Sequence, residues 1–335
     1  METARFTRSA IAVCVAAASM VSLLSPLAQA QEQPASYPSR QIEFVVPFPA
    51  GGSADVIARL VAHAAAETWL QTIVIQNRAG ATGQIAGEYV TRAPPDGYVL
   101  LLATASTHTV LPAFKPNLPY DTVTGFAPAT LLSTFPNMLV VNPQKVTAQT
   151  VADFIRYVKD NPGKLNYAST GQGSSTHFTA ELFKLMTGTK MTHVPYRGGS
   201  TGHADLISGN VDLTFDNMAS VLPLAQEGKL KALGVASLER TPLAPQIPAI
   251  AETVPGFEAN SWVGVVAPPG TPAGIVARIA QAFGDGVKRA DVAKRLNELG
   301  AAASPNTPAE FVKFLREDRE RWQRVAREAG LSSGN

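Results

Sequence analysis

Short apolar runs alternate with amphipathic helical patterns along most of the chain, beginning near residue 42. The apolar runs predict strands at 42–46, 73–76, 99–103, 138–141, 164–168, 191–195, 211–215, 232–236 and 264–267. Segments with helical periodicity predict helices at 54–67, 84–92, 151–161, 175–187, 204–208, 220–226, 273–288, 291–299 and 308–329. Strands that alternate with helices of about 10 to 15 residues are typical of βαβ units, so the sequence predicts an α/β fold with mostly parallel sheets.

Two extended apolar segments flanked by proline, at 137–143 and 261–272, are suited to strands that cross between two lobes. The C-terminal part of the chain is strongly helical, and we expect it to pack back on the first lobe. We therefore predict a discontinuous first lobe, residues 31–138 and 262–335, and a second lobe, residues 139–261.

Composition supports a core-forming globular protein. The chain has 335 residues, enough for one large or two modest domains, and 45% of them are hydrophobic while 16% are charged. The formal net charge is only +2 and is spread along the chain, whereas nucleic-acid binding would need a basic face. We expect no nucleic-acid partner.

Residues 1–30 have the pattern of a secretory signal peptide. Arg5 and Arg8 precede an apolar stretch, and Ala28-Gln29-Ala30 fits a cleavage site. The apolar stretch is short for a membrane span. The only cysteine, Cys14, lies inside this segment, so the mature chain would have no disulfide and no thiolate site. We expect cleavage after Ala30 and export of a soluble protein.

The sequence gives little support for a metal, a cofactor or catalysis. We expect no G-x-S-x-G nucleophile elbow, and the sequence contains no H-E-x-x-H motif and no P-loop. The glycines between Gly80 and Gly87 open a predicted helix, but they lack the G-x-G-x-x-G spacing and the acidic residue of a dinucleotide site. The five histidines show no metal-ligand spacing. We expect no cofactor, no bound metal and no catalytic residue.

Five loops rich in glycine, serine and threonine each follow a predicted strand. They span residues 48–55, 104–108, 169–177, 196–201 and 215–217. In an open α/β sheet, ligands bind outside the carboxyl ends of the strands, so we expect these loops to converge on one cleft. Each loop taken alone fits a turn or a helix N-cap equally well. The coincidence of five such loops favours a binding site.

The chemistry of these loops favours an anionic ligand. The first amides of a helix have no internal partner and lie at the positive end of the helix dipole. Glycine lets a carboxylate approach those amides without meeting a Cβ atom. Because neutral donors suffice, Arg197 need only lie at the rim. Asp55 is explained as a cap, or as an acceptor for an amino or hydroxyl group of the ligand, and Trp262 as packing at the hinge.

Several stretches of the sequence resemble one family of receptors. The sequence is similar, over nearly the whole mature chain, to the solute receptors of the tripartite tricarboxylate transporter family, also called Bug or TctC-like receptors. The matching stretches are Val45–Gly52, Asp55, Ala58–Arg59, Gln76–Arg78, Ala93–Tyr98, Asn117–Asp121, Phe126–Pro128, Glu181–Gly188, His193–Gly199 and Phe215–Asn217.

The resemblance implies a two-lobed periplasmic binding protein of type II, a "Venus flytrap" with two doubly wound mixed sheets joined by crossover strands. It implies a non-enzymatic, monomeric periplasmic receptor that binds a small carboxylate between its lobes and delivers it to membrane permease subunits. The ligand class stays open between a mono-, di- or tricarboxylate, an amino acid and an aromatic acid.

The resemblance also assigns ligand-binding residues to both lobes. In the first lobe they are Phe48, Ala50, Gly51, Gly52, Ser53, Asp55, Ser106 and Thr107. In the second lobe they are Thr170, Gly171, Gly173, Ser174, Ser175, His177, Asp216 and Asn217.

Two alternatives remain from other classes of protein. One is an exported serine-type hydrolase that uses a loop serine such as Ser174 with His177, three residues further on. However, His177 has no acidic residue in its own loop to orient it. The other is a receptor with the same site that only signals to a sensor kinase.

Overall fold

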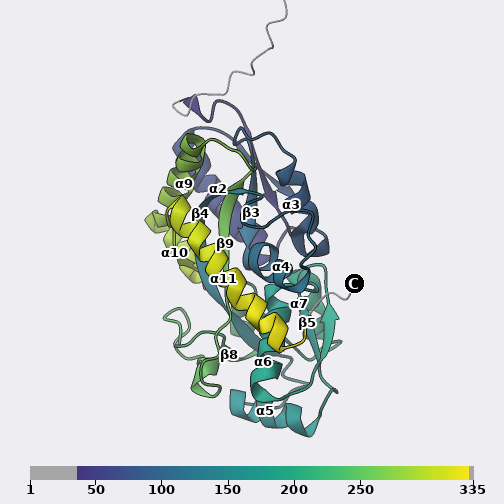
Figure 1. The fold of residues 1–335 in the computed structure, drawn as a ribbon. Coiled ribbons are helices and arrows are strands. Elements are labelled where there is room, and N and C mark those ends of the chain that lie inside the picture. Colours follow the sequence, from purple (N-terminus) through teal and green to yellow (C-terminus); the bar gives the residue numbers. More distant parts are fainter. Residues whose placement is uncertain (1–35, 332–335) are drawn as a thin grey trace, which may run out of the picture. The chain divides into compact units, whose positions relative to one another are not determined.

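The computed structural model describes residues 36–331, which form a mixed sheet covered by helices (Figure 1). The strands hydrogen-bond in the order β2-β1-β3-β9-β4-β7-β5-β6, and β8 and β10 also pair with β4. Strand β4 (Ala127–Val141) changes partners along its length. Its residues up to Pro136 pair with β9, and those from Asn137 onward pair with β7 and β8. We call the strands on either side of this change the first and second half-sheets.

The first half-sheet has a parallel centre and antiparallel additions. Strand β1 (Ile42–Val46) is parallel to β2 (Ile73–Asn77) and to β3 (Val99–Thr104). Strand β9 (Asn260–Ala267) is antiparallel to both β3 and β4, and β10 (Ala302–Ala303) pairs with β4. The near-continuous apolar runs of β1 and β3 are what a strand covered on both faces requires.

The second half-sheet repeats this mixture. Strands β7 (Leu213–Asn217) and β8 (Lys231–Val235) flank β4 in antiparallel pairs. Strand β5 (Asn166–Ser169) is parallel to β7 and to β6 (Thr192–Pro195). In both half-sheets, each parallel strand other than β2 ends at one of the five loops singled out in the sequence.

The helices connect the strands and cover both faces of each half-sheet. The α-helices are α2 (Ser53–Trp69), α3 (Gln84–Thr91), α4 (Leu111–Phe114), α5 (Val151–Asp160), α6 (Ser175–Thr187), α7 (Gly199–Ser208), α8 (Met218–Gln226), α9 (Ala273–Lys288), α10 (Ala290–Glu298) and α11 (Pro308–Glu328). The shorter helical turns are η3 (Ala81–Gly83), the π-helix η4 (Ser106–Val110) and η5 (Ile250–Glu252).

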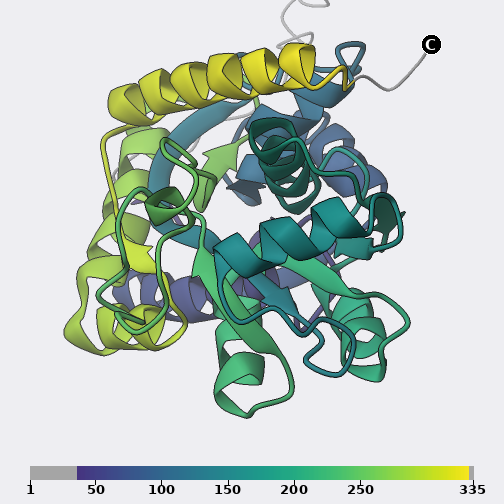
Figure 2. The ribbon, with the colours of Figure 1, turned by 90° about the horizontal axis from the view of Figure 1, so that it is seen from below.

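Alternating residues of the strands enter separate apolar clusters on opposite faces. In β4, Leu139 packs in one cluster and Val140 in another. Helix α11 contributes to a cluster of each half-sheet, with Phe311 among the residues around β3 and β9, and Trp322 beside α6. Figure 1 shows this helix, in yellow, lying along β4 and β9 towards α6, and Figure 2 shows it along one side of the strands.

The α/β prediction is confirmed, and each predicted strand and helix corresponds to an observed one. The bounds of 42–46, 175–187 and 273–288 agree with the structure. The first eleven residues of β4 were missed, because two prolines and several hydroxyl residues interrupt the apolar pattern there. Helix α7 begins at Gly199 rather than at 204. The predicted signal peptide lies outside the described residues.

No helix within residues 36–331 is long and apolar enough to cross a membrane.

The space around two buried glycines predicts opposite effects on stability when each is replaced by alanine. At Gly264 in β9, a Cβ would lie 2.4 Å from Phe311 Cζ and 2.8 Å from the Thr130 carbonyl oxygen, so Gly264→Ala should lower the free energy of unfolding by about 1–3 kcal/mol. At Gly284, inside α9, the nearest atom would be 3.6 Å away. Gly284→Ala should therefore raise stability by about 0.5–1 kcal/mol. Urea denaturation of both variants measures these effects, and destabilisation of equal size in both would contradict the packing argument.

Candidate functional site

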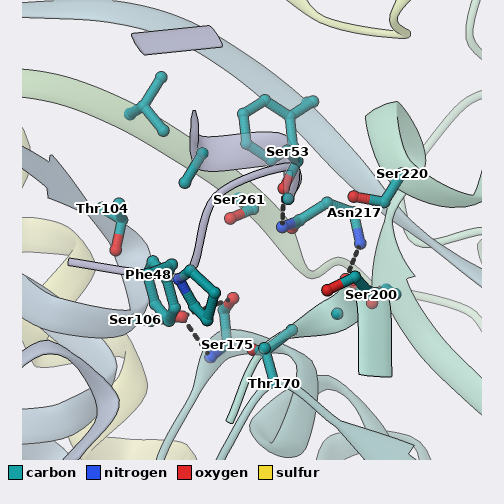
Figure 3. A pocket seen from close by; sticks show the side chains of 18 of the residues that line it. Phe48, Ser53, Thr104, Ser106, Thr170, Ser175, Ser200, Asn217, Ser220 and Ser261 are labelled. Atoms are coloured by element: carbon teal, nitrogen blue, oxygen red, sulfur yellow. Dashed lines mark hydrogen bonds between the residues drawn. The ribbon is translucent and has the colours of Figure 1, made fainter. Parts of the chain in front are cut away.

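A cavity of about 40 Å³ lies where both half-sheets present the carboxyl ends of their parallel strands (Figure 3). Strands β4 and β9 supply further side chains to its wall. The lining residues are Phe48, Pro49, Gly52, Ser53, Ala54, Thr104, Ser106, Phe135, Thr170, Ser175, Gly198, Gly199, Ser200, Asp216, Asn217, Ser220, Ser261, Trp262 and Val263. Of these, Asp216 alone carries a formal charge, and the rest offer hydroxyl groups, amides and apolar surface.

The loop from β1 to α2 is held in place by Asp55. Its carboxylate accepts hydrogen bonds from the Gly51 N–H at 2.9 Å, from Arg59 Nε at 3.0 Å and from Asn77 Nδ2 at 2.8 Å. Asn77 Nδ2 also donates to the Phe48 carbonyl oxygen at 3.0 Å. Asp55 therefore points back into its own loop and does not line the cavity. Its structural role is to fix the loop backbone, which does line the cavity.

Three helices begin at the cavity without a side-chain cap. Their N-cap residues are Gly52 for α2, Gly198 for α7 and Asn217 for α8, and in none of them does a side chain accept a hydrogen bond from the first turn. By contrast, the Ser174 side chain caps α6 by accepting from the His177 N–H. Uncapped first-turn amides retain their hydrogen-bonding capacity and their positive field, which favours an anion.

The π-helix η4 separates the roles of two adjacent hydroxyl residues. Thr107 Oγ1 accepts from the Thr104 N–H at 3.1 Å and is used within the turn. Ser106 instead reaches the start of α6, where its Oγ accepts from the Ser175 N–H at 3.0 Å and lies 3.0 Å from Ser175 Oγ (Figure 3). This pair joins the two half-sheets across one side of the cavity.

Two more hydrogen bonds join the half-sheets. Asn217 Nδ2 donates to Ser53 Oγ at 3.0 Å, which links the starts of α8 and α2 (Figure 3). Thr82 Oγ1 donates to the Gln172 carbonyl oxygen at 2.7 Å. Thr82 lies in a stretch where Gly80, Ala81, Thr82 and Gly83 all have positive φ angles, and Ala81 and Thr82 are strained in this conformation.

Ser174 and His177 do not form a nucleophile–base pair. His177 Nδ1 accepts from the Gly173 N–H at 3.2 Å, and its ring stacks on His193 with 4.0 Å between centroids. Burial, and then the nearby Lys184 charge, lower the pKa of His177 to about 4, so its ring is neutral near pH 7. The Ser174 hydroxyl caps the helix instead. Both residues therefore shape the β5–α6 loop.

The expectation that the sequence has no G-x-S-x-G motif is wrong, because Ser200 stands in that local pattern. Gly198-Gly199-Ser200-Thr201-Gly202 follows β6 and matches G-x-S-x-G. In the structure Ser200 lies within the first turn of α7 and is not among the residues with positive φ. Among the described residues, no hydrogen bond joins its hydroxyl to His203, so the strained nucleophile turn is not formed.

Half of the predicted ligand-binding residues line the cavity: Phe48, Gly52, Ser53, Ser106, Thr170, Ser175, Asp216 and Asn217. The others lie just behind it or beside it: Ala50, Gly51, Asp55, Thr107, Gly171, Gly173, Ser174 and His177. Gly171 lines a neighbouring groove, and Gly51 lines a second pocket that Gly52 and Ser53 share with the cavity.

Sequence reasoning missed the part of the wall that comes from the middle of strands. Phe135 in β4 and Ser261–Val263 in β9 line the cavity. Trp262, interpreted as hinge packing, is among the residues around the cavity, and its indole packs against Phe311 while Nε1 donates to Asp318 Oδ2 at 2.8 Å. Thr104 and Gly198–Ser200 lay inside loops that the sequence did single out.

Comparison with solved structures defines the class of protein. An R. palustris protein solved with adipate is 36% identical, with a TM-score of 0.85 over 88% of this chain and 99% of that one. MatC from Rhodopseudomonas palustris, solved with bound malate, is 34% identical, with a TM-score of 0.82 over 86% and 99%. The periplasmic binding protein BugD is 30% identical, with a TM-score of 0.84 over 89% and 100%. The predicted α/β periplasmic binding protein fold is thus confirmed.

Comparison of sequences defines the family. The sequence model of the tripartite tricarboxylate transporter family receptor, TctC, matches residues 57–331. Protein BugT of Bordetella pertussis is 34% identical, over 88% of this chain and 91% of BugT. The chain belongs to the TctC family of periplasmic solute-binding receptors, as its sequence motifs predicted.

The hydrogen bonds of Asp55 predict a pH-dependent contribution to stability. Burial opposes its ionisation, but the bonds from Arg59, Gly51 and Asn77 outweigh this and hold the pKa of Asp55 below its ordinary value of 3.8. Its contribution is therefore present above the unfolded-state pKa and is lost as the pH falls through the lower folded-state pKa.

Asp55→Asn should lower the free energy of unfolding by about 1–3 kcal/mol at pH 7, because it weakens hydrogen bonds to a buried charge. The difference from the unmutated protein should shrink as the pH falls below about 4. Urea unfolding at pH 7, 5 and 3.5 measures this trend. A difference that stays constant over this range would contradict the role given to the charge. Asp160→Asn, on the last turn of α5, is the matched control.

Proposed function

We propose that this protein is an exported, monomeric periplasmic receptor that binds a small carboxylate in the cavity between the half-sheets and delivers it to a membrane permease. The observation that carries the proposal is the convergence of three uncapped helix starts on one cavity. The exported location rests on the pattern of residues 1–30 and on the family.

The start of α2 is the best place for the ligand's carboxylate. Gly52 has ordinary backbone angles, φ −80° and ψ 169°, and an added Cβ would meet only the Pro49 carbonyl oxygen, at 3.7 Å. The lack of a side chain there leaves the first amides of α2 open to a ligand. Ser53 adds a hydroxyl donor. No lysine or arginine lines the cavity, so the carboxylate would be held by neutral donors and the helix dipole.

Relatives support the class of ligand and the partner. Two solved structures more than 30% identical to this chain are described with adipate and with bound malate. The family is described as the receptor of a tripartite tricarboxylate transporter, so we assign permease subunits as the partner. A receptor that only signals to a sensor kinase would use the same cavity and differ in partner alone.

We propose that ligand binding closes two lobes about β4 and β9. The first lobe would be residues 31–138 and 262–335, and the second would be residues 139–261. The change of partners between Pro136 and Asn137 in β4 supports this boundary. Hydrogen bonds such as Ser106–Ser175 and Ser53–Asn217 would exist only in the closed form, and a ligand that touches both lobes would shift the balance towards it.

We propose no catalytic activity. The family consists of solute-binding receptors. Neither Ser174 nor Ser200 has a hydrogen bond to a histidine ring among the described residues, so the arrangement needed to activate a serine is missing from both.

A thermal-shift screen tests the proposed function. The mature protein is heated with mono-, di- and tricarboxylates, aromatic acids and amino acids, each matched with its amide or ester. A true ligand at 100 times its Kd should stabilise the protein by about 2.7 kcal/mol and raise its Tm, whereas the uncharged analogue should not. The proposal fails if no carboxylate raises the Tm while a chromogenic ester is hydrolysed and Ser174→Ala or Ser200→Ala abolishes the hydrolysis.

Gly52→Val should separate binding from folding. The backbone angles at this position suit any residue, so the melting temperature without ligand should change little. The added methyl groups would cover the amides of α2 and should weaken carboxylate binding at least about tenfold by isothermal titration calorimetry. Unchanged affinity would remove the start of α2 from the site. Gly284→Ala, which is remote from the cavity, serves as a binding control.

A further inference from the structure

Asp216 places a carboxylate in the wall of the cavity for which we propose an anionic ligand. It stands at the end of β7, its side chain is only 4% exposed, and no other charged side chain lines the cavity. A buried carboxylate is costly unless hydrogen bonds and local fields stabilise its charge. Its surroundings therefore decide what it can do for a ligand.

Both oxygens of Asp216 are fixed by neighbouring groups. Oδ1 accepts from the Asn217 N–H at 2.6 Å, and Oδ2 lies 2.7 Å from His203 Nε2. Since a carboxylate only accepts, the His203 Nε2 atom carries the proton in this bond. The side chain is thus held in one orientation at the wall of the cavity.

The two helix starts in the second half-sheet already face this carboxylate. A Cβ on Gly199, the first residue of α7, would lie 3.2 Å from Asp216 Oδ2. Helix α8 begins directly after Asn217, whose N–H donates to Oδ1. The positive fields of α7 and α8 therefore act on the protein's own anion. Of the three uncapped helices, α2 alone has its field free for a carboxylate of the ligand.

The hydrogen bond between Ser53 and Asn217 brings the free start of α2 close to Asp216, which the starts of α7 and α8 already face. The 3.0 Å bond between Asn217 Nδ2 and Ser53 Oγ places the residue next to Asp216 against the first residue of α2. A small ligand with its carboxylate at α2 would have its neighbouring atoms close to Asp216. A second carboxylate at that point would be repelled, while a hydroxyl or ammonium group could donate to the Asp216 oxygens.

We propose that Asp216 is a specificity-determining residue, which selects carboxylates that carry a hydrogen-bond donor, a hydroxyl or amino group, close to the carboxylate. This inference rests on the proposed function and narrows its ligand class. The competing reading is structural: the contact with His203 would only anchor α7 to β7, and the ligand would not touch Asp216.

Matched ligand pairs that differ only in the donor test the proposal on the unmutated protein. The pairs are lactate and propionate, alanine and propionate, malate and succinate, and aspartate and succinate, measured by isothermal titration calorimetry. The donor-bearing member of at least one pair should bind about tenfold more tightly or better, as expected for a hydrogen bond to a charged group. The hydroxyl and amino arms show which donor is preferred. Equal affinities within every pair would overturn the proposal.

Asp216→Asn then tests whether Asp216 itself recognises the hydrogen-bond donor of the ligand. The amide keeps the size of the side chain and one acceptor oxygen, so a melting curve should show a folded protein. The preference for the donor-bearing ligand should fall to about threefold or less, while affinity for the donor-free acid should hold or rise as the repulsion disappears. An equal loss of affinity for both members of a pair would support the structural reading and overturn the proposal.

The control is Asp205→Asn on α7. Asp205 lies outside the cavity, accepts from the Tyr196 hydroxyl at 2.6 Å, and tests the same chemical change in the same helix region. Its donor preference should match that of the unmutated protein. This experiment separates two failures: if no carboxylate binds at all, the proposed function is wrong, and if carboxylates bind without a donor preference, only the role of Asp216 is wrong.

Discussion

The backbone hydrogen bonds of β4 impose the constraint on which the rest of the structure depends. The strand pairs with β9 up to Pro136, and from Asn137 it pairs with β7 and β8. Because one strand is common to both half-sheets, the ends of β1 and β3 on one side, and of β5 and β7 on the other, open towards the same space. The loops that follow these strands meet there for that reason, although up to about 170 residues of sequence separate them.

The recognition that we propose in this space would depend on backbone groups, with Asp216 as the one charged side chain in the lining. The loop before α2 ends in glycine, and Asp55, which could have faced a ligand, turns back to hold the Gly51 N–H. Ser106 is a second uncharged contact of this kind, since its hydroxyl accepts a hydrogen bond from the first amide of α6 across the cavity. A site of this kind attracts an anion through oriented dipoles, and its small hydroxyl side chains leave the shape of the space to the strands.

The sequence predicts regular elements well where one physical signal dominates. Helix α9 has a clean apolar face, and its bounds were predicted correctly. The first part of β4 was missed because Pro128, Thr130 and Pro136 mask a strand that is stabilised by pairing on both edges, a tertiary effect. Likewise α7 begins at Gly199 although glycines at 199 and 202 lower the helix propensity of this turn, and the close approach of Gly202 to Tyr196 and Ala168 leaves little room for a side chain there.

The site shows the same division. The loops at the strand ends could be predicted as parts of the site, because chain topology brings them together. The sequence could not predict which residues of these loops face the cavity. Gly173 and Ser174 close a turn, whereas Ser175 one residue later faces the cavity. Phe135 and Ser261 carry no local signal at all, since a strand residue that faces a cavity looks the same in sequence as one that faces a core.

Helix α11 packs against both half-sheets and would limit how far they could turn against each other in the proposed closure. Phe311 packs with the strands of the first, Trp322 packs with α6 beside the second, and Asp318 between them holds both Thr109 and Trp262. A straight helix cannot stretch, so any rotation about β4 must slide one of these contacts or bend the helix. This 21-residue C-terminal helix would therefore restrict the opening of the two half-sheets. A change in the stiffness of the helix would change the amplitude of that opening from a place remote from the cavity.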